Sequence, residues 1–497
     1  MAGFGLTLPK AAASISTHAH TEAPPTSALT DVTRLSALEL RVAFASRALS
    51  PVEAVGAVLD RIETVGRQLN AFVTVTAEEA IDAARRAERA WWRNEAGPLA
   101  GIPFSVKDTI VTKGVRTTMG SRRLADWVPS IDAPSVERCR RAGGALLGKT
   151  NTPEFGWKYE TTNPLAGTTR NPWNLDLTPG GSSGGAAAVV AAGLGPLALG
   201  SDTAGSTRIP AAFCGVIGFK PSYGVIPVAP GSGIETLGHV GVLARAVRDV
   251  ALMLDVCSGP DPRDRLSLPA GEETFSSAVD RGIDGLRIAW SSDLGYAAIN
   301  PEVRDAVAAA VRAFDDVAVV EEISPSLEDP FEIVEPLLAA GAAGAHRDDF
   351  AAVRDELDPE RVPVVERGFR LTAADVGAAL AARARFVDSM RELMEPYDLL
   401  LTPAAPVTAF EVGKQGPATV DGRVLPGLSW GGLAYAFNLT GQPAASVPCG
   451  LVGGLPVGLQ IVGPWRDDAA VLRACAAFER ARPWAATRPD SIPATSD

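Results

Sequence analysis

Two segments rich in glycine and serine have the residue types that nucleophilic attack on a carbonyl requires. Residues 178–185 place four glycines around Ser182 and Ser183, and residues 201–210, which hold Ser206, follow an apolar run that predicts a buried strand. A serine at the end of a strand, preceded by small residues, can point its hydroxyl into a cleft while successive backbone N–H groups bind an anion. Glycine–serine segments alone are more often linkers or tight turns, so the second segment is what favours catalysis.

Histidine, the usual base for a nucleophilic serine, is scarce in this chain. There are four, and His18 and His20 fall in an expected N-terminal tail. His239 and His346 have no acidic partner in a recognisable hydrolase motif, and no G-x-S-x-G motif is present. Lys107 ends an apolar run that predicts a strand, and it is the alternative candidate for the base.

A lysine can accept a proton only if its pKa is lowered. At pH 7 an amine with the ordinary pKa of about 10.4 is neutral roughly once in 2,500 molecules, a penalty of about 4.6 kcal/mol. Desolvation at the end of an apolar strand can lower the pKa of Lys107. A solvated lysine at a strand end, which is the alternative interpretation, could not serve. The hypothesis therefore requires Lys107 to be buried.

Composition and charge exclude several other classes of protein. The net charge of −12, from 46 basic and 58 acidic residues, and the lack of a basic run argue against nucleic-acid binding. Five scattered cysteines and the lack of clustered metal ligands predict reduced, buried thiols, no metal and no cofactor. No signal-peptide core and no apolar run of ~20 residues is present, so we expect no membrane association and a cytoplasmic location.

Helices and short buried strands alternate along the chain, which predicts an α/β fold. Ser36, Ser50 and Thr76 each stand three residues before a glutamate and predict helix starts with a capping hydroxyl. Strands are expected at 71–76, 102–106, 145–148, 197–200, 286–290 and 397–402 and in two runs over 444–462, and helices at 183–192, 244–257 and 467–481.

One domain is expected over residues 31–482, between a flexible N-terminal tail at 1–30 and a C-terminal tail at 483–497. Residues 260–395 are richer in charge and in helix-like pattern, and they could be a helical insertion or a cap. No linker divides the chain into independent parts. A homodimer is the oligomeric state that base rates favour.

The chain resembles the amidase signature family in several motifs. The hallmarks are a lysine in a Gly-Ile-Pro-Phe-x-Val-Lys-Asp context, a glycine–serine stretch and an Asp-x-x-Gly-Ser-x-Arg segment, found here at 101–108, 178–185 and 202–208. Their separations, 75 residues from Lys107 to Ser182 and 24 from Ser182 to Ser206, are those expected of the family. Further similarity lies at 148–155, 169–173, 214–221 and 454–460. The resemblance covers roughly residues 31–482 and implies the amidase signature fold, a large mixed central β-sheet covered by helices on both faces.

This resemblance implies a Ser-Ser-Lys mechanism. Ser206 would attack the carbonyl, and Ser182, on an unusual cis peptide bond to Gly181, would relay the proton to neutral Lys107. The same relay would protonate the leaving amine, and water would then release the acyl group. A short hydroxyl can bridge a nucleophile and a lysine that are too far apart for one hydrogen bond.

The resemblance also implies roles for the residues around the triad. The oxyanion hole would be formed by the backbone N–H groups of Thr203, Ala204, Gly205 and Ser206. Each well-placed donor contributes about 3–4 kcal/mol. Asp202 and Arg208 would pair to brace this loop, and Ser183 would cap a helix or support the site through hydrogen bonds. Thr207 stands where the family usually has an aliphatic residue, which affects packing more than the catalytic atoms.

The resemblance implies that the acyl pocket is built from the segment near Phe155 and Trp157, from the loop before Ser182, which holds Gly180, and from the region around Trp430. Trp127, Trp157 and Trp430 would be pocket walls that favour aromatic or apolar acyl groups. Because the chain has nine tryptophans, simple packing is the alternative for each of them.

The leading hypothesis is a hydrolase that cleaves an amide-type C–N bond of a small molecule through an acyl-enzyme on Ser206. Its substrate could be an amide, an aryl amide, a carbamate, a hydrazide or an ester. The alternative within the family is the A subunit of a tRNA-dependent amidotransferase, which releases ammonia from glutamine; the N-terminal extension, residues 156–158 and Thr207 argue against it. A catalytically silent binding protein is the third hypothesis, and the presence of all three triad residues argues against it.

Overall fold

The structure of the protein, a computed structural model, describes residues 31–231, 233–234 and 236–489. The expected N-terminal tail at 1–30 and residues 490–497 of the expected C-terminal tail lie outside these ranges. Within them, no helix combines the length and the apolar character that a membrane-spanning segment requires.

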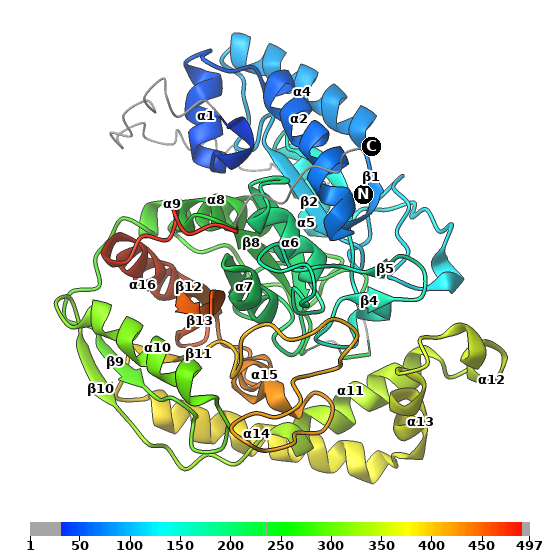
Figure 1. Ribbon diagram of the computed structural model, residues 1–497, viewed down its shortest axis with the longest axis vertical. Helices are drawn as coiled ribbons and strands as arrows, with labels where there is room; N and C mark the ends of the chain where they lie inside the picture. Colours follow the sequence, from blue (N-terminus) through cyan, green and yellow to red (C-terminus); the bar gives the residue numbers. More distant parts are fainter. Residues whose placement is uncertain (1–30, 232, 235, 490–497) are drawn as a thin grey trace, which may run out of the picture.

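A mixed eleven-stranded β-sheet forms the centre of the molecule and confirms the predicted fold class (Figure 1). The strand order is β1-β3-β2-β6-β8-β7-β12-β13-β11-β9-β10. β2 is parallel to β3 and β6, and β9 is parallel to β10 and β11, whereas the other neighbours are antiparallel. The strands are β1 (Phe72–Val75), β2 (Pro103–Lys107), β3 (Ala145–Thr150), β6 (Leu197–Asp202), β7 (Ile217–Lys220), β8 (His239–Ala244), β9 (Arg287–Trp290), β10 (Val319–Glu322), β11 (Leu399–Pro403), β12 (Ala444–Val452) and β13 (Leu455–Val462), with a separate pair β4 (Thr162–Asn163) and β5 (Gly167–Thr168).

Both faces of the sheet are covered. Every residue of β2, β3, β7, β8 and β11 is buried, although successive side chains of a strand point to opposite faces. The helices are α1 (Ala37–Ala45), α2 (Pro51–Arg61), α3 (Arg67–Leu69), α4 (Ala77–Trp92), α5 (Pro134–Arg141), α6 (Gly184–Ala191), α7 (Arg208–Cys214), α8 (Val247–Cys257), α9 (Phe275–Ala278), α10 (Pro301–Val311), α11 (Phe331–Ala345), α12 (Phe350–Val353), α13 (Val362–Arg370), α14 (Ala373–Met394), α15 (Gly432–Leu439) and α16 (Asp468–Ala481).

Two of the three predicted helix caps are present. Ser36 and Ser50 form capping boxes at the starts of α1 and α2. The helix start predicted at Thr76 is confirmed, because α4 begins at Ala77, but its hydroxyl donates to the carbonyl of Leu146 in β3 at 2.7 Å and makes no cap bond to α4. The Thr76 hydroxyl thus forms a hydrogen bond to a neighbouring strand in place of the expected hydrogen bond to the first turn of α4.

The stretch 260–395 is not an insertion made of helices alone. It contributes β9 and β10, which extend the central sheet beyond β11, before the chain enters α11 to α14. α11 packs against α13 and α14, and both α11 and α14 contact α15. Figure 1 shows α11 and α14 along one side of the molecule, with α12 and α13 at the end of this layer.

The predicted boundary of the C-terminal tail at residue 483 is too early. Trp484 is only 8% exposed, and its indole N–H donates to the carbonyl of Arg245 at 2.9 Å. The chain after α16 therefore stays on the molecule, because this indole adds to the core.

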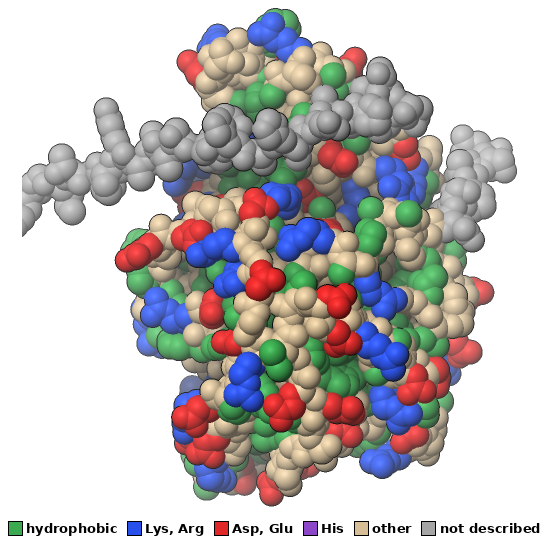
Figure 2. Space-filling model, turned by 90° about the vertical axis from the view of Figure 1, so that its left-hand side faces the viewer, with side chains coloured by type: hydrophobic (Ala, Val, Ile, Leu, Met, Phe, Trp, Pro, Cys, Tyr) green, Lys and Arg blue, Asp and Glu red, His purple; other side chains and the backbone are tan. Residues whose placement is uncertain are grey.

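The surface carries charges of both signs. On the face shown in Figure 2, basic and acidic side chains are interspersed among apolar and neutral ones. Exposed pairs such as Arg354–Glu366, at 3.1 Å, contribute about 0–1 kcal/mol each. The stability of the fold therefore comes chiefly from the buried core.

Candidate active site

Parallel pairing of β2 and β6 brings two predicted site segments to the same edge of the sheet. Lys107 ends β2, Asp202 ends β6, and the register sets Val106 opposite Leu199. The carboxyl ends of parallel strands meet at one edge, where ligands bind in α/β sheets. The lysine and the second serine segment thus converge, although they are far apart in sequence.

The Lys107 side chain is wholly buried, as its predicted role requires. Its Nζ donates to Ser182 Oγ at 2.7 Å and to Ser201 Oγ at 2.9 Å. Burial lowers the pKa of Lys107 to about 7, and the negative charge of Asp202 opposes this shift. With that pKa, roughly half of the molecules hold a neutral amine at pH 7, which removes most of the penalty of about 4.6 kcal/mol.

Burial alone does not distinguish Lys107 from two other lysines of the sheet. Lys149 and Lys220 are also wholly buried, and desolvation lowers the pKa of each to about 7. Lys149 Nζ donates to the carbonyl of Ile110 and to Thr112 Oγ1, and Lys220 Nζ donates to backbone carbonyls. Of these three lysines, it is Lys107 whose Nζ contacts serine hydroxyls, so geometry identifies the candidate base.

The glycine–serine stretch holds Ser182 beside Lys107. The peptide bond between Gly181 and Ser182 is cis. A Cβ on Gly181 would lie 2.6 Å from backbone atoms of Tyr159 and Glu160, so only glycine fits at this position. Ser182 is 2% exposed, and the chain enters α6 two residues later.

Ser183 ties the two serine segments together. Its backbone N–H donates to the carbonyl of Ser206 at 3.1 Å. Its hydroxyl donates to the carbonyl of Ser201 at 3.0 Å and accepts from the Ser201 N–H at 3.3 Å. It makes no side-chain cap bond to α6, so the supporting role fits and the capping role does not.

Ser206 lies in the loop between β6 and α7 and is 6% exposed. Gly205 before it adopts φ of +108°, and a Cβ there would lie 2.4 Å from the Ala434 side chain. Within the described ranges the Ser206 hydroxyl makes no hydrogen bond, to Ser182 or to any other residue. Catalytic hydrogen bonds are often long or unmade in a site without substrate. The relay from Ser206 to Ser182 therefore stays a prediction.

Asp202 and Arg208 form the brace that the sequence predicts. Both side chains are wholly buried, with Nη2–Oδ1 and Nε–Oδ2 distances of 2.9 and 3.0 Å. Although burial alone would raise it, the Arg208 guanidinium holds the pKa of Asp202 well below its ordinary value. Arg208 also donates to the carbonyl of Ala434, to Gln460 Oε1 and to Asn438 Oδ1, which fixes the loop to α15 and β13.

The backbone donors of this loop divide into two groups. The N–H of Gly205 donates to Asp202 Oδ1 at 2.7 Å, so it is already engaged by the brace. The N–H groups of Thr203, Ala204 and Ser206 donate to no acceptor in the described part of the chain. Three of the four predicted oxyanion donors thus have no protein acceptor among the described residues, and the fourth positions the loop.

Two residues that the sequence did not identify also shape the site. Ser201 accepts from Lys107 Nζ, and Tyr159 donates its hydroxyl to the carbonyl of Ala204 at 2.6 Å. Ser201 directly precedes Asp202 in β6, and successive side chains of a strand point to opposite faces. The sequence spacing therefore did not indicate that Ser201 contacts Lys107. Thr207, the departure from the family pattern, has a buried hydroxyl without a partner among the described residues.

The predicted substrate residues occupy different surroundings. Trp430 is 3% exposed and packs on the rings of Tyr159, Phe213 and Phe410, which favours the packing interpretation. Trp127 is 36% exposed, and no contact with the triad places it at the site.

Gly180 and the segment around Phe155 lie closer to the triad. Gly180 is buried, and its carbonyl accepts from the Thr161 hydroxyl at 2.7 Å. Phe155 and Trp157 are half-buried and flank Gly156. A Cβ on Gly156 would lie 3.2 Å from Ser182 Oγ, so this segment borders the triad.

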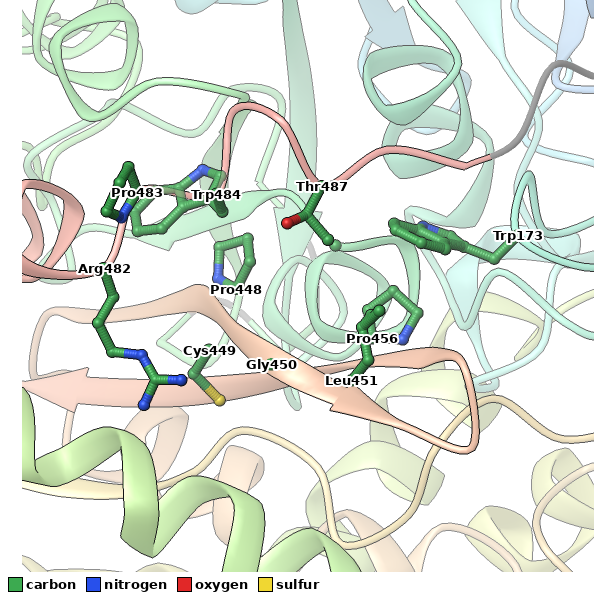
Figure 3. A pocket seen from close by; sticks show the side chains of 11 residues that line it. Trp173, Pro448, Cys449, Gly450, Leu451, Pro456, Arg482, Pro483, Trp484 and Thr487 are labelled. Carbon is green, nitrogen blue, oxygen red and sulfur yellow. The ribbon is translucent and has the colours of Figure 1, made fainter.

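A separate pocket of about 200 Å³ lies away from these residues. Figure 3 shows it between the β12–β13 hairpin and the C-terminal segment, with Trp173, Pro456 and Trp484 among its walls. None of its lining residues belongs to α7, although Gly215, which directly follows the helix, is one of them, and no triad residue lines it.

Comparisons with known proteins agree with the motifs. A family model described as Amidase matches residues 53–472. An acylamidase of Rhodococcus erythropolis is 40% identical over 467 residues, covering 92% of this chain and 98% of the relative. The A subunit of the glutamyl-tRNA(Gln) amidotransferase of Moorella thermoacetica is 37% identical over 486 residues, with coverage of 92% and 98%.

Solved structures give the same result at the level of the fold. A bacterial aryl acylamidase of the amidase signature family superimposes with a TM-score of 0.86 at 32% identity, covering 92% of this chain and 99% of the other. A 6-aminohexanoate cyclic dimer hydrolase reaches 0.84 at 30% identity with the same coverage. The motifs, the fold and these matches over most of its length show that the chain belongs to the amidase family.

Proposed function

We propose that this amidase hydrolyses the amide bond of small N-acyl compounds, aryl amides among them, through an acyl-enzyme on Ser206. The observation that carries the proposal is the contact of 2.7 Å between the buried Lys107 Nζ and Ser182 Oγ. The next residue, Ser183, donates its backbone N–H to the carbonyl of Ser206, so Ser182 and Ser206 are held in adjoining segments. The similarity to an acylamidase and to an aryl acylamidase supports this substrate class.

In the proposed mechanism, protons move along one line of three side chains. Ser206 Oγ attacks the carbonyl carbon and gives its proton to Ser182 Oγ, while Ser182 gives its own proton to neutral Lys107. The open N–H groups of Thr203, Ala204 and Ser206 receive the negative charge that develops on the carbonyl oxygen.

Collapse of the tetrahedral intermediate then breaks the C–N bond. The leaving nitrogen takes a proton from Ser182, which regains one from the Lys107 ammonium. Water next attacks the acyl-enzyme and loses its proton to the same relay, so that the carboxylic acid leaves and Ser206 is restored. No charged group has to cross the site, because the serine between nucleophile and lysine gives and takes a proton in each step.

The test is turnover of acetyl 4-nitroanilide by wild type, Ser206→Ala, Lys107→Met and Lys149→Met. Lys149→Met is the matched control, because it also replaces a wholly buried lysine of lowered pKa but one without a serine contact. We expect the first two variants to lose more than about a thousandfold in kcat and the control to keep most of it. Wild-type turnover by Lys107→Met, or an equal loss in Lys149→Met, would contradict the proposed base.

A second candidate is glutaminase activity within an amidotransferase. It is favoured by the 37% identity to the A subunit of such an enzyme over 92% of this chain. Release of ammonia from glutamine at a higher kcat/KM than that for the anilide would support it. A strong preference for the anilide would instead support the proposed acylamidase.

A further inference from the structure

Residues 346–362, which we call the cap, follow α11, include α12 and end at the first residue of α13. Figure 1 shows α12 and α13 beyond the end of α11. The cap lies against residues 154–158: the Asp358 N–H donates to Glu154 Oε2 at 2.8 Å, and Trp157 Nε1 donates to Asp358 Oδ2 at 3.5 Å. The cap thus covers the segment that borders Ser182.

An ion-pair cluster fastens the cap to this segment. Lys158 is 5% exposed, and its Nζ lies 2.6 Å from Glu360, 3.5 Å from Asp358 and 3.5 Å from Glu160. Although burial alone would lower it, these carboxylates raise the pKa of Lys158, so the amine stays charged. Two of the three carboxylates belong to the cap, and the third precedes the glycine–serine stretch.

An aromatic contact fastens the cap a second time. The Phe155 ring lies under the Arg361 guanidinium at 4.2 Å and against the His346 ring at 5.8 Å. It also packs on a small apolar core of Val353, Leu357 and Val362 within the cap. Phe155 adopts φ of +52°, an unfavourable backbone for a bulky residue that this packing sustains. The ring is therefore an anchor for the cap, whereas the resemblance implied that this segment builds the acyl pocket.

The position of Gly156 assigns this wall to one side of the substrate. Gly156 lies between Phe155 and Lys158 in the chain, and a Cβ on it would lie 3.2 Å from Ser182 Oγ. In the proposed mechanism, Ser182 donates a proton to the leaving nitrogen. The leaving amine must therefore lie on the Ser182 side, beside Gly156 and Trp157 and under the cap, while the acyl group extends away from them.

We propose that the cap and residues 155–158 form the leaving-group site, and that the ion pairs of Lys158 with the cap limit the bulk of the amine that the enzyme can release. This inference rests on the proposed function. It adds that the cap selects for the amine half of the substrate and not for the acyl half. A side chain at Gly156 would press on Ser182 Oγ, and glycine avoids this crowding beside the group that protonates the amine. The half-buried Trp157 ring offers an apolar surface for an aromatic amine.

The experiment compares Glu360→Lys with the matched control Glu356→Lys. Both change an exposed cap glutamate in the same way, but Glu360 touches Lys158 and Glu356 forms no ion pair within the described ranges. One substrate pair keeps the acetyl group and changes the amine from 4-nitroaniline to the bulkier 7-amino-4-methylcoumarin. A second pair keeps 4-nitroaniline and changes the acyl group from acetyl to butyryl. Hydrogen exchange of residues 346–362 reports whether the cap has loosened.

For Glu360→Lys we expect the kcat/KM ratio of coumarin amide to nitroanilide to rise about tenfold, with the butyryl-to-acetyl ratio within about twofold of wild type. The control should leave both ratios unchanged. An unmoved or falling amine ratio, or two ratios that rise together, would overturn the proposal. If Glu360→Lys does not fold, Glu360→Gln removes the same ion pair, and a rise of about threefold in the amine ratio alone is expected. Failure of wild type on every anilide would instead count against the proposed function.

Discussion

Replacement of Ser201 by alanine should change the pH dependence of catalysis by lowering the pKa of Lys107. Ser201 Oγ accepts a hydrogen bond from Lys107 Nζ at 2.9 Å, and such a bond is stronger when the amine is charged. A hydrogen bond to a charged group contributes about 1.5–3 kcal/mol, and a bond between neutral groups contributes about 0.5–1.5 kcal/mol. Removing the Ser201 hydroxyl therefore destabilises the ammonium form of Lys107 by about 1 kcal/mol more than the neutral amine. Because one pKa unit equals about 1.36 kcal/mol, the pKa of Lys107 should fall from about 7 to roughly 6.3.

The sign of the effect follows from the role of the amine. In the proposed mechanism catalysis needs neutral Lys107, so kcat/KM should rise with pH through its pKa and be constant above it. At pH 6 roughly a tenth of wild type and a third of the variant would be neutral. Relative to its own value at high pH, Ser201→Ala should therefore be roughly fourfold more active at pH 6 than wild type.

The assay is kcat/KM for acetyl 4-nitroanilide between pH 5 and 9 in wild type, Ser201→Ala and Ser201→Thr. The threonine variant keeps a hydroxyl at the same position and should keep the wild-type acid limb. A purely structural defect would lower the whole profile without moving its midpoint. An acid limb that stays in place in Ser201→Ala, or moves to higher pH, would refute Lys107 as the titrating base.

Three further outcomes are expected. In Gly181→Ala the new Cβ has no room against the Tyr159 backbone. We expect kcat to fall on the order of a hundredfold and Tm to fall with it, and wild-type turnover would disprove the packing argument. Tyr159→Phe removes the bond to the Ala204 carbonyl, so kcat should fall about tenfold with KM nearly constant; a change confined to KM would speak against a role in the oxyanion loop. The pKa of Lys149 is about 7 in the folded protein and about 10.5 in the unfolded chain. Between these pH values the unfolded chain binds one more proton than the folded protein, so the free energy of unfolding rises with pH. Urea unfolding at pH 7.5 and 9 should show a smaller rise in Lys149→Met, by up to about 1.4 kcal/mol per pH unit, and equal rises would contradict the lowered pKa.

The fold was predictable where local pattern and tertiary structure agree. Apolar runs bounded by glycine marked β2, β3 and β6, and the capping boxes at Ser36 and Ser50 are local by nature. β7 and β8 were not predicted, because short buried strands that contain glycine lack the alternation that marks a half-exposed strand. Thr76 shows the opposite case, a correct local signal overridden by a partner on another strand.

The site was predictable in its motifs and less so in its contacts. Lys107 could be chosen because histidines were scarce and the apolar run before it predicted burial, and the structure buries it. The engagement of the Gly205 N–H by Asp202 depends on the shape of a loop that no spacing reveals. The anchoring of Phe155 by Arg361 joins residues more than two hundred positions apart, a contact that one sequence without a structure cannot show.

The buried bonds of Arg208 have a consequence for the order in which the protein is made. All three residues of the proposed triad have been synthesised once the ribosome reaches Ser206, yet the loop that carries Ser206 is fastened through Arg208 to α15 and to Gln460. Those partners, Ala434 in α15 and Gln460, follow Arg208 by 226 and 252 residues. A nascent chain therefore contains all three proposed triad residues long before the partners that fix the Ser206 loop are made, and we expect activity only when nearly the whole chain has emerged.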